Sequence, residues 1–547
     1  MRSGRAASRS PTAPDRGERV SDASAPVEVE LKLAIDPAAV AALRAHPALR
    51  AVVRGRARTA SIVSTYFDTP DQRLRRDGVA LRLRRDGRRW LMTAKGAPLP
   101  GAASGVVSRP EYEWPLAGPQ IDTMRLATTP WRAVFVKALR KGGLAPAFST
   151  DFRRTSLPLA FPDGTTATLA IDLGRLDAPA SHRQAATWAG IAEIEIELRE
   201  GDPGRLVDLA SSLAAELPLA VEPRSKAERG YALAEGKADE PSRAGEIVHA
   251  EGASASTAVA AVVAECVRQI ERNALGFRGG ALRDAEWIHQ MRIAVRRLRS
   301  CITLADGVLA SDAIERLRHE TRWVLDTLGP ARDLDVFALE TLPAVEADLV
   351  RTAGDGSATT ATLRSLTRRT ATRRRAAHAA SVDCVTSPRF TRFVLTTYGT
   401  ALPAPRDGAA AGAGAEDARR YAARLIDRRA RRLAKAARRL ANGGVDERHA
   451  IRIAAKKLRY ATEFFATLFP ARRARVYRKA LAVLQDELGA FNDAAVAPRV
   501  AAALAGPTAA ATVAIESWSA GRAGASGRSI AAAWAAFEAV APFWKRG

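Results

Sequence analysis

The first half of the chain places charged side chains at every second position of several short stretches. Glu28, Glu30 and Lys32 alternate with Val and Leu. In a β-strand, residues two apart project to the same face, so these three groups share one face and the apolar residues share the other. The spacing recurs in further sets: Arg82 with Arg84, Thr93 with Lys95, Glu111 with Glu113, and Glu193 with Glu195 and Glu197.

Two interpretations of these charged faces are open. An antiparallel sheet with one solvated face also carries charge at alternate positions. However, carboxylates stacked at ~6–7 Å along a strand repel one another, and solvated faces usually dilute like charges with Thr, Ser or Gln. If the sheet closes with its charged face inward, the carboxylates can hold hard divalent cations and the basic groups can hold phosphates. Over several strands together, the closed sheet is favoured.

Other kinds of reactive site find little support in the sequence. The chain contains no GxxxxGK[ST], no GxGxxG after a strand-like run and no HExxH. Its three cysteines, Cys266, Cys301 and Cys384, form no close pair. This spacing excludes both a disulfide scaffold and a CxxC-type zinc or redox site.

Length and periodicity divide the chain into two folded parts. Its 547 residues exceed the ~250–300 at which a single hydrophobic core stops growing. Period-two alternation over about 27–232, with Asp-Gly turn signals, predicts mostly antiparallel strands with a few helices. From about residue 253 to the end, apolar residues instead recur every three or four positions, which predicts an all-helical part. We therefore expect an α+β, multidomain protein.

Two further segments lack periodicity. Residues 233–252 are polar and contain Gly and Pro, as expected for a linker, and residues 1–26 are rich in Arg, Ser, Ala and Pro, as expected for a disordered arm. No run of ~18 apolar residues and no apolar signal region is visible in the sequence. We expect a cytoplasmic protein without membrane association.

The helical part contains an internal repeat. The stretch from His289 to Arg299 recurs from His449 to Arg459, and the stretch 325–333 is matched by 485–493 at the same offset of 160. Two matches at one offset indicate a duplicated helical unit. At ~100° per residue, the His and basic residues of each copy fall on one helix face beside the buried stripe. An anion between them would relieve their repulsion, whereas an ordinary solvated basic face is the alternative.

The charge balance indicates a polyanionic partner. The formal net charge is +25, and residues 27–232 contribute +7 whereas residues 250–547 contribute +18. Such an excess suits nucleic acid, polyphosphate, phosphorylated metabolites or an acidic membrane. An aromatic content of 6% and the lack of a recognisable reading module make nucleic acid unlikely.

The first part resembles the CYTH superfamily, the triphosphate tunnel enzymes. The resemblance rests on blocks in family order: Glu28-Val29-Glu30-Leu31-Lys32, Tyr66-Phe67-Asp68-Thr69, Leu81-Arg82-Leu83-Arg84, Thr93-Ala94-Lys95-Gly96, Glu111-Tyr112-Glu113-Trp114, Ile171-Asp172-Leu173-Gly174, the 193–198 ladder and Ser225-Lys226-Ala227-Glu228-Arg229-Gly230-Tyr231. It implies an eight-stranded antiparallel tunnel that cleaves the terminal phosphoanhydride of a triphosphate with Mg²⁺ or Mn²⁺. The match at Phe152-Arg153-Arg154 is weaker, and we expect Arg154 to point inward.

The resemblance also implies roles for individual residues. The implied phosphate-binding residues are Lys32, Arg82, Arg84, Lys95, Arg154 and Lys226. The implied metal ligands are Glu28, Glu30, Glu111, Glu113, Asp172, Glu195 and Glu197, and the four expected to be catalytic are Glu28, Glu30, Glu195 and Glu197.

The second part resembles the CHAD family, the conserved histidine α-helical domain, over roughly residues 256–545. The resemblance implies two related helical bundles that face one another around a basic surface and bind inorganic polyphosphate. The implied contacts are His289, Arg292, Arg296, Arg299, His449, Arg452, Lys456 and Arg459. Lys456 replaces the Arg of the first copy, which keeps the charge but loses the bidentate geometry.

Taken together, these features predict metal-dependent hydrolysis of inorganic triphosphate to pyrophosphate and phosphate, with polyphosphate binding by the helical part. Association with polyphosphate granules in the cytoplasm would follow. Two alternatives stay open. One is an enzyme acting on an organic triphosphate, either a thiamine triphosphatase or an adenylate cyclase. The other is a polyphosphate-binding protein without catalysis.

Overall fold

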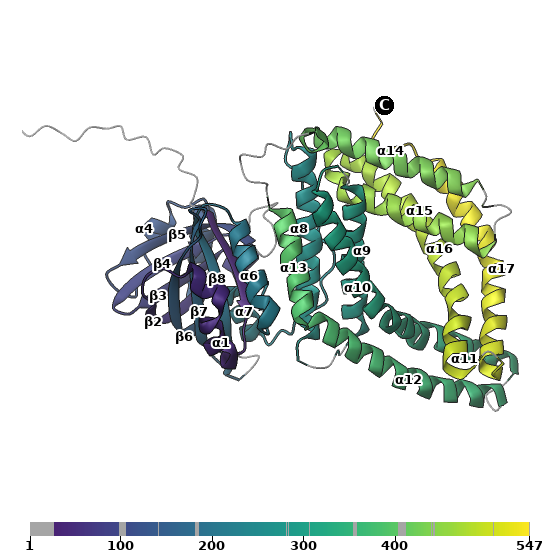
Figure 1. The fold of residues 1–547 in the computed structure, drawn as a ribbon, viewed down its shortest axis with the longest axis horizontal. Coiled ribbons are helices and arrows are strands. Elements are labelled where there is room, and N and C mark those ends of the chain that lie inside the picture. The colour runs from purple at the N-terminus through teal and green to yellow at the C-terminus, as the bar shows by residue number, and fades with distance from the viewer. Residues whose placement is uncertain are drawn as a thin grey trace, which may run out of the picture.

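The computed structural model describes residues 27–97, 106–140, 142–180, 185–279, 282, 284–305, 307–353, 358–402, 412–438, 440, 444–506 and 508–545. The arm predicted over residues 1–26 lies outside them. Figure 1 shows a strand-rich part followed by a helical part, which confirms the predicted change of fold along the chain. Within the described residues, no helix is both long and apolar enough to span a bilayer.

One antiparallel sheet forms the strand-rich part. Among the described residues it contains eight long strands and a ninth of two residues. The strands are β1 (Val27–Ala34), β2 (Arg58–Asp68), β3 (Ala80–Asp86), β4 (Arg89–Lys95), β5 (Val106–Leu116), β6 (Ala145–Ala160), β7 (Thr166–Ala178), β8 (Thr187–Glu200) and β9 (Ala220–Val221). Their order is β5-β4-β3-β2-β6-β7-β8-β1-β9.

The sheet closes on itself through β1. One side of β1 pairs with β8, where Lys32 lies opposite Glu195, and the other side pairs with β5 over residues 27–31. Beyond that stretch, β9 takes over the same side of β1 at Leu33 and Ala34. The result is the predicted eight-stranded tunnel with one short strand added at its end.

Apolar residues on the outer face of the tunnel are covered by short helices. Against β1 and β6–β8 lie α1 (Val40–Ala45), α2 (Pro47–Val52) and α6 (Gly204–Glu216), which bury residues such as Ile171 and Ile194. Against β3 and β4 lie α3 (Arg73–Arg76), α4 (Thr123–Leu126) and α5 (Arg132–Arg140). Burying the outer face in this way leaves the charged residues on the inner face.

The inner face is apolar at one end, where α7 (Lys226–Glu235) packs. Tyr66 and Phe148 stack with ring centroids 4.5 Å apart, and Tyr231 of α7 meets Phe148 edge-on at 5.0 Å. The first residue of α7 is Lys226, capped by Ser225. This packing fixes α7 against the tunnel and leaves the polar groups in the remainder of the interior.

The helical part consists of long helices in two related sets. They are α8 (Ala255–Ala274), α9 (Ala285–Leu304), α10 (Ser311–Val336), α11 (Leu342–Ala353), α12 (Ala358–Val385), α13 (Pro388–Ala401), α14 (Ala418–Ala437), α15 (Val445–Phe464), α16 (Ala471–Ala505) and α17 (Ala510–Glu538). The repeated motifs lie on α9 and α15, and each is followed by a helix carrying the second matched stretch, α10 or α16. The duplication predicted from the sequence is therefore present in the fold.

The two parts share an apolar interface. Helix α6 of the tunnel packs beside α13, and one continuous set of buried residues runs from Leu209 of α6 to Val263 of α8 and Phe393 of α13. Figure 1 shows α13 and α8 as the helices nearest the tunnel. The Thr391 hydroxyl of α13 donates a hydrogen bond to the Leu219 carbonyl at 2.7 Å. The helical part therefore packs directly against the tunnel.

Candidate functional site

Three carboxylates meet inside the tunnel, two of them buried and one partly buried. Asp172 of β7 lies opposite Glu193 of β8 in the strand register, and Glu195 follows Glu193 on the same face. Each of the three offers an oxygen within 4.8 Å of the others. Asp172 and Glu193 are fully buried, so like charges are concentrated where water cannot screen them. Such a cluster persists only if cations balance it.

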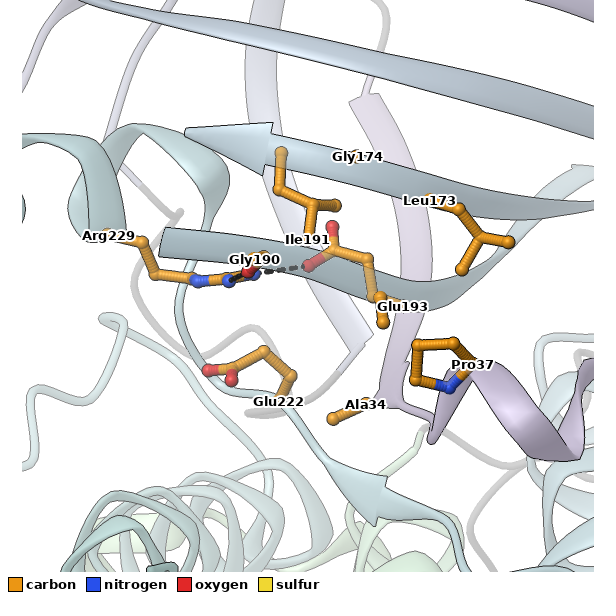
Figure 2. A pocket seen from close by; sticks show the side chains of 10 residues that line it. Ala34, Pro37, Leu173, Gly174, Gly190, Ile191, Glu193, Glu222 and Arg229 are labelled. Atoms are coloured by element: carbon orange, nitrogen blue, oxygen red, sulfur yellow. Dashed lines mark hydrogen bonds and ion pairs between the residues drawn. The ribbon is translucent and has the colours of Figure 1, made fainter. Parts of the chain in front are cut away.

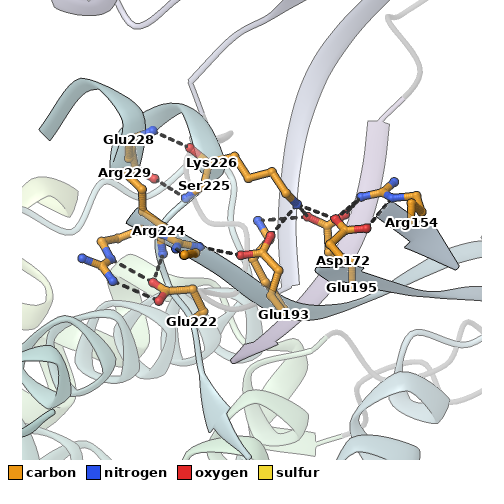
Figure 3. A network of polar contacts seen from close by, with 12 residues as sticks. Arg154, Asp172, Glu193, Glu195, Glu222, Arg224, Ser225, Lys226, Glu228 and Arg229 are labelled. Atoms are coloured by element: carbon orange, nitrogen blue, oxygen red, sulfur yellow. Dashed lines mark hydrogen bonds and ion pairs between the residues drawn. The ribbon is translucent and has the colours of Figure 1, made fainter. Parts of the chain in front are cut away.

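Basic side chains supply that balance in the structure. The guanidinium group of Arg154 donates to both oxygens of Asp172 at 2.8 and 2.7 Å and also pairs with Glu195. The Lys226 ammonium lies 2.7 Å from Asp172 and 2.9 Å from Glu195, and it also bonds Glu193 (Figure 3). Arg153, on the other face of β6, is exposed. Arg154 is thus the arginine of this pair that faces inward.

The pKa values of Glu195 and Lys226 are shifted by the charges around them. Burial alone would raise the pKa of Glu195, but Lys226, Arg154 and Lys32 outweigh it and hold that pKa well below its usual value. Burial would likewise lower the pKa of Lys226, yet the three carboxylates raise it. Glu195 and Lys226 are therefore both charged at neutral pH.

The first strand adds Glu30 and Lys32 to this cluster. The Lys32 ammonium lies 3.6 Å from Glu30 and 3.5 Å from Glu195, and both Glu30 and Lys32 are buried. Glu28 belongs to the same strand, but its side chain lies outside the described residues. Glu197 is farther along β8, where it pairs with Arg199 at 2.9 Å.

A second group of charges lies across β3, β4 and β5. Lys95 pairs with Glu111 at 2.7 Å, and Arg84 pairs with Glu113 at 2.7 Å. Arg82 lies 4.0 Å from Glu111. Within the described part of the chain, the buried Nε atoms of Arg82 and Arg84 have no hydrogen-bond partner. Two buried donors without an acceptor favour an anionic ligand here.

Glu193 was not among the residues that the sequence analysis assigned to the site, although its ladder was recognised. One of its oxygens faces Lys226 in the tunnel, and the other accepts a hydrogen bond from Arg229 of α7 at 2.8 Å. It also borders a cavity of about 440 Å³ (Figure 2). That cavity is lined by Ala34, Pro37, Leu173, Glu193, Glu222 and Arg229, among others. The alternation along β8 was the available signal, because residues 193, 195 and 197 share one face.

The acidic cluster suits a hard divalent cation. Carboxylate oxygens are the ligands that Mg²⁺ and Mn²⁺ prefer, and Asp172, Glu193 and Glu195 converge without softer sulfur or imidazole donors among the described residues of the cluster. Glu30 is close enough to share Lys32 with Glu195. The cations that neutralise the cluster in this structure are the side chains of Lys226, Arg154 and Lys32.

Some of the predicted basic residues of the helical part come together between α9 and α15. Arg296 of α9 lies close enough to Arg452 and Lys456 of α15 for its charge to act on both. Burial, then Arg452 and Arg296, lowers the pKa of Lys456 to about 7. The buried Nε of Arg452 has no partner within the described residues. The two copies of the motif therefore bring cations together across α9 and α15, as the resemblance implied.

Other predicted residues make contacts within the helical part. Arg292 is buried and donates to the Leu325 carbonyl of α10 at 2.9 Å. Arg459 pairs with Glu463 at 2.6 Å. Arg299 acts instead on Lys457, together with Arg429 and Arg432 of α14, so a second basic cluster lies beside the first. The sequence analysis did not select the two arginines of α14, which belong to no repeated motif.

The two histidines of the motif differ in their surroundings. His289 is half-buried, and burial followed by the charge of Arg332 lowers its pKa. His449 is exposed, with its Nδ1 3.3 Å from the Asn492 side-chain oxygen. His289 thus joins the basic cluster of α9, whereas His449 is exposed and contacts Asn492 of α16.

Comparison with known proteins identifies both parts of the chain. The CYTH domain family model matches residues 27–231, and the CHAD domain family model matches residues 261–502. Inorganic triphosphatase of Haemophilus influenzae is 32% identical over 207 residues, which cover 38% of this chain and 54% of that protein. The chain therefore spans about half the length of this relative. These matches confirm both resemblances.

Solved structures also resemble each part. The CHAD domain of the plant Ricinus communis is 28% identical and covers 56% of this chain and 98% of its own, with a TM-score of 0.46. A Hippeastrum protein described as having a dominant triphosphatase activity is 20% identical and covers 39% of this chain and 97% of its own, with a TM-score of 0.27.

Proposed function

Because residues 27–231 belong to the CYTH domain family and residues 261–502 belong to the CHAD domain family, we propose that this protein hydrolyses inorganic triphosphate in the tunnel and binds polyphosphate through its helices. The observation that carries the proposal is the pairing of a buried acidic cluster with buried guanidinium donors that have no acceptor among the described residues. A receptor for anions alone would gain nothing from three converging carboxylates.

The basic residues would bind the substrate. Arg82, Arg84 and Lys95 lie on the neighbouring strands β3 and β4, Arg154 lies close enough to Arg84 for its charge to act on it, and the charges of Lys226 and Lys95 both act on Tyr66. A triphosphate would replace the carboxylates as the partner of these cations. Since the ion pairs already hold each side chain in place, little conformational entropy is lost when the substrate enters.

The carboxylates would hold one or two divalent cations, Mg²⁺ or Mn²⁺. When bound, such a cation neutralises phosphate charge and lowers the pKa of a water molecule. Asp172, Glu193, Glu195 and Glu30 are the described carboxylates placed to hold it, and one of them would accept the proton of the attacking water. The basic residues would meanwhile stabilise the charge that develops on the departing pyrophosphate.

The helical part would bind inorganic polyphosphate. Arg296, Arg452 and Lys456 combine cations from both repeats, and Arg299 with Lys457 extends the positive surface. A linear polyanion can contact all of these residues at once, which favours long chains over short ones. Such binding would localise the enzyme to polyphosphate granules in the cytoplasm.

The test of the catalytic proposal is a phosphate-release assay with tripolyphosphate, ATP, thiamine triphosphate and long polyphosphate, each with Mg²⁺, Mn²⁺ or EDTA. Wild-type protein should prefer tripolyphosphate and be inactive in EDTA. Glu30→Gln should reduce kcat by roughly 100-fold or more, because it removes one charged oxygen from the cluster without changing the volume of the side chain.

Glu216→Gln is a matched control, because Glu216 lies at the exposed end of α6 outside the tunnel. It should behave like the wild type. Undiminished hydrolysis in EDTA would contradict the metal-dependent mechanism, and a preference for ATP or thiamine triphosphate would contradict the assignment of an inorganic substrate.

A further inference from the structure

A short segment connects the inside of the tunnel with the helical part. Residues 219–228 run from just before β9 to the first turn of α7, and the helical part contacts this segment at several atoms. Thr391 of α13 donates to the Leu219 carbonyl at 2.7 Å. Arg278, which follows α8, donates to the Val221 carbonyl and also to a Glu222 oxygen at 3.0 Å. The segment is therefore held at both its backbone and its side chains.

Glu222 is the buried centre of these contacts. Its two oxygens accept from Arg224 at 2.9 and 3.0 Å as well as from Arg278 (Figure 3 shows the Arg224 pair). Burial alone would raise the pKa of Glu222, but Arg224 and Arg278 outweigh it and lower the pKa to about 2. Glu222 thus remains ionised, and it needs both arginines to balance a charge that is almost entirely removed from water.

The helical part also contacts the start of α7. The Ser225 hydroxyl accepts from the Glu228 amide at 3.1 Å, and a Glu228 oxygen accepts from the Ser225 amide at 2.8 Å. The other oxygen of Glu228 accepts from Arg272 of α8 at 2.6 Å. A residue of the helical part therefore holds the Glu228 side chain of the capping box at which α7 begins.

The first residue after this cap is Lys226. Its ammonium group reaches all three carboxylates of the cluster: it lies 2.7 Å from Asp172 and 2.9 Å from Glu195, and it also pairs with Glu193. Because Lys226 is the first residue of α7, any shift of the cap moves its ammonium group relative to the cluster. On the far side, Gly230 lies directly against Phe148, so α7 cannot move farther into the tunnel.

We propose that Arg272 and Arg278 of the helical part are positioning residues for Lys226 in the tunnel. They fix the 219–228 segment and thereby set where the Lys226 ammonium meets the substrate phosphates and the acidic cluster. The helical part is then required for full triphosphatase activity, separately from any polyphosphate that it binds. This inference rests on the proposed function, because Lys226 is taken to contact the triphosphate.

The experiment is a double-mutant cycle on the full-length chain with tripolyphosphate as substrate. Arg272→Ala with Arg278→Ala should lower kcat/KM on the order of tenfold, with KM rising as well as kcat falling. In a Lys226→Ala background the same pair should cause no further loss, because the residue through which they act is absent. Replacing both arginines with lysine should restore most of the activity.

The matched control removes two arginines that do not contact the segment. Arg268 of α8 pairs with Glu265, and Arg316 of α10 pairs with Asp312. Replacing both with Ala removes the same charge and should leave kcat/KM unchanged. An equal loss in this control would mean that overall charge, not positioning, is responsible. An equal loss in the Lys226→Ala background would mean that the arginines act on the fold in general, and either result overturns the proposal.

Failure of the proposed function can be recognised separately. If the wild type releases no phosphate from tripolyphosphate, the catalytic proposal fails. The same variants are then compared by their Kd for tripolyphosphate, measured by calorimetry in EDTA. Positioning of Lys226 still predicts weaker binding for the Arg272 and Arg278 variants and no further change in the Lys226→Ala background. Additive changes in Kd would overturn the positioning of Lys226 even then.

Discussion

Polyphosphate binding should weaken steeply above neutral pH because of Lys456. Burial, then Arg452 and Arg296, lowers the pKa of its ammonium to about 7 in the free protein, while Asp493 acts in the opposite direction. A bound polyanion favours the charged form and raises that pKa. The contribution of Lys456 to the affinity for polyphosphate is therefore complete well below pH 7. It is lost as the pH rises from 7 toward the pKa that Lys456 has in the complex.

The size of the effect follows from the fraction of Lys456 that is charged. If the pKa in the complex lies above 9, the affinity should fall about twofold between pH 6 and 7 and about 90-fold between pH 6 and 9. The ligand should be a long polyphosphate. Its terminal phosphate groups also titrate near neutral pH, but in a long chain they carry only a small share of the ligand's charge.

The measurement is the Kd for long polyphosphate on the full chain from pH 6 to 9 at constant ionic strength. Lys456→Arg is the decisive comparison, since an arginine in this position stays protonated and the steep loss of affinity should disappear. If the wild type and Lys456→Arg show the same pH dependence, the proton taken up on binding belongs to another group and the argument is wrong.

Three further outcomes can be checked independently. Arg82→Ala should raise KM for tripolyphosphate roughly tenfold or more by removing a buried donor, whereas the exposed Arg89→Ala should match the wild type in the same steady-state assay. Gly230→Ala should destabilise the tunnel by about 1–3 kcal/mol in chemical denaturation, because its new Cβ would lie 2.1 Å from the Phe148 ring; an unchanged midpoint would show that α7 can move away. Arg296→Ala should weaken polyphosphate binding and lower the steepness of its salt dependence, which a titration at several salt concentrations measures.

The sequence was sufficient to predict which residues face the tunnel interior. Alternation along a strand assigns each side chain to a face, so Glu30 and Lys32 could be placed from the sequence. The choice of Arg154 over Arg153 was only a preference, because the match around them is weaker. The register between strands was not predictable in the same way. The pairing of Asp172 with Glu193, which makes Glu193 part of the cluster, depends on how β7 and β8 align.

The helical part was predicted less completely for a different reason. A repeated motif shows which residues share a helix face, but not which of them are used for packing between helices. Arg292 donates to a carbonyl of α10, and Arg459 pairs with Glu463 on its own helix. Likewise, nothing in the local pattern around Arg272 or Arg278 indicates a partner in the tunnel, since Glu228 and Glu222 precede them by 44 and 56 positions.

The closure of the tunnel through β1 has a consequence for synthesis on the ribosome. Among the described strands, β1 emerges first, yet it must await β5, which pairs with Glu30 at Val107, and β8, which pairs with Glu30 at Glu197. Contacts this distant in sequence form slowly, and an unpaired strand is a template for aggregation. A nascent chain that stalls before β8 therefore exposes β1 to other chains. The side chains that β1 contributes to the site reach their partners only after about residue 200 has emerged from the ribosome.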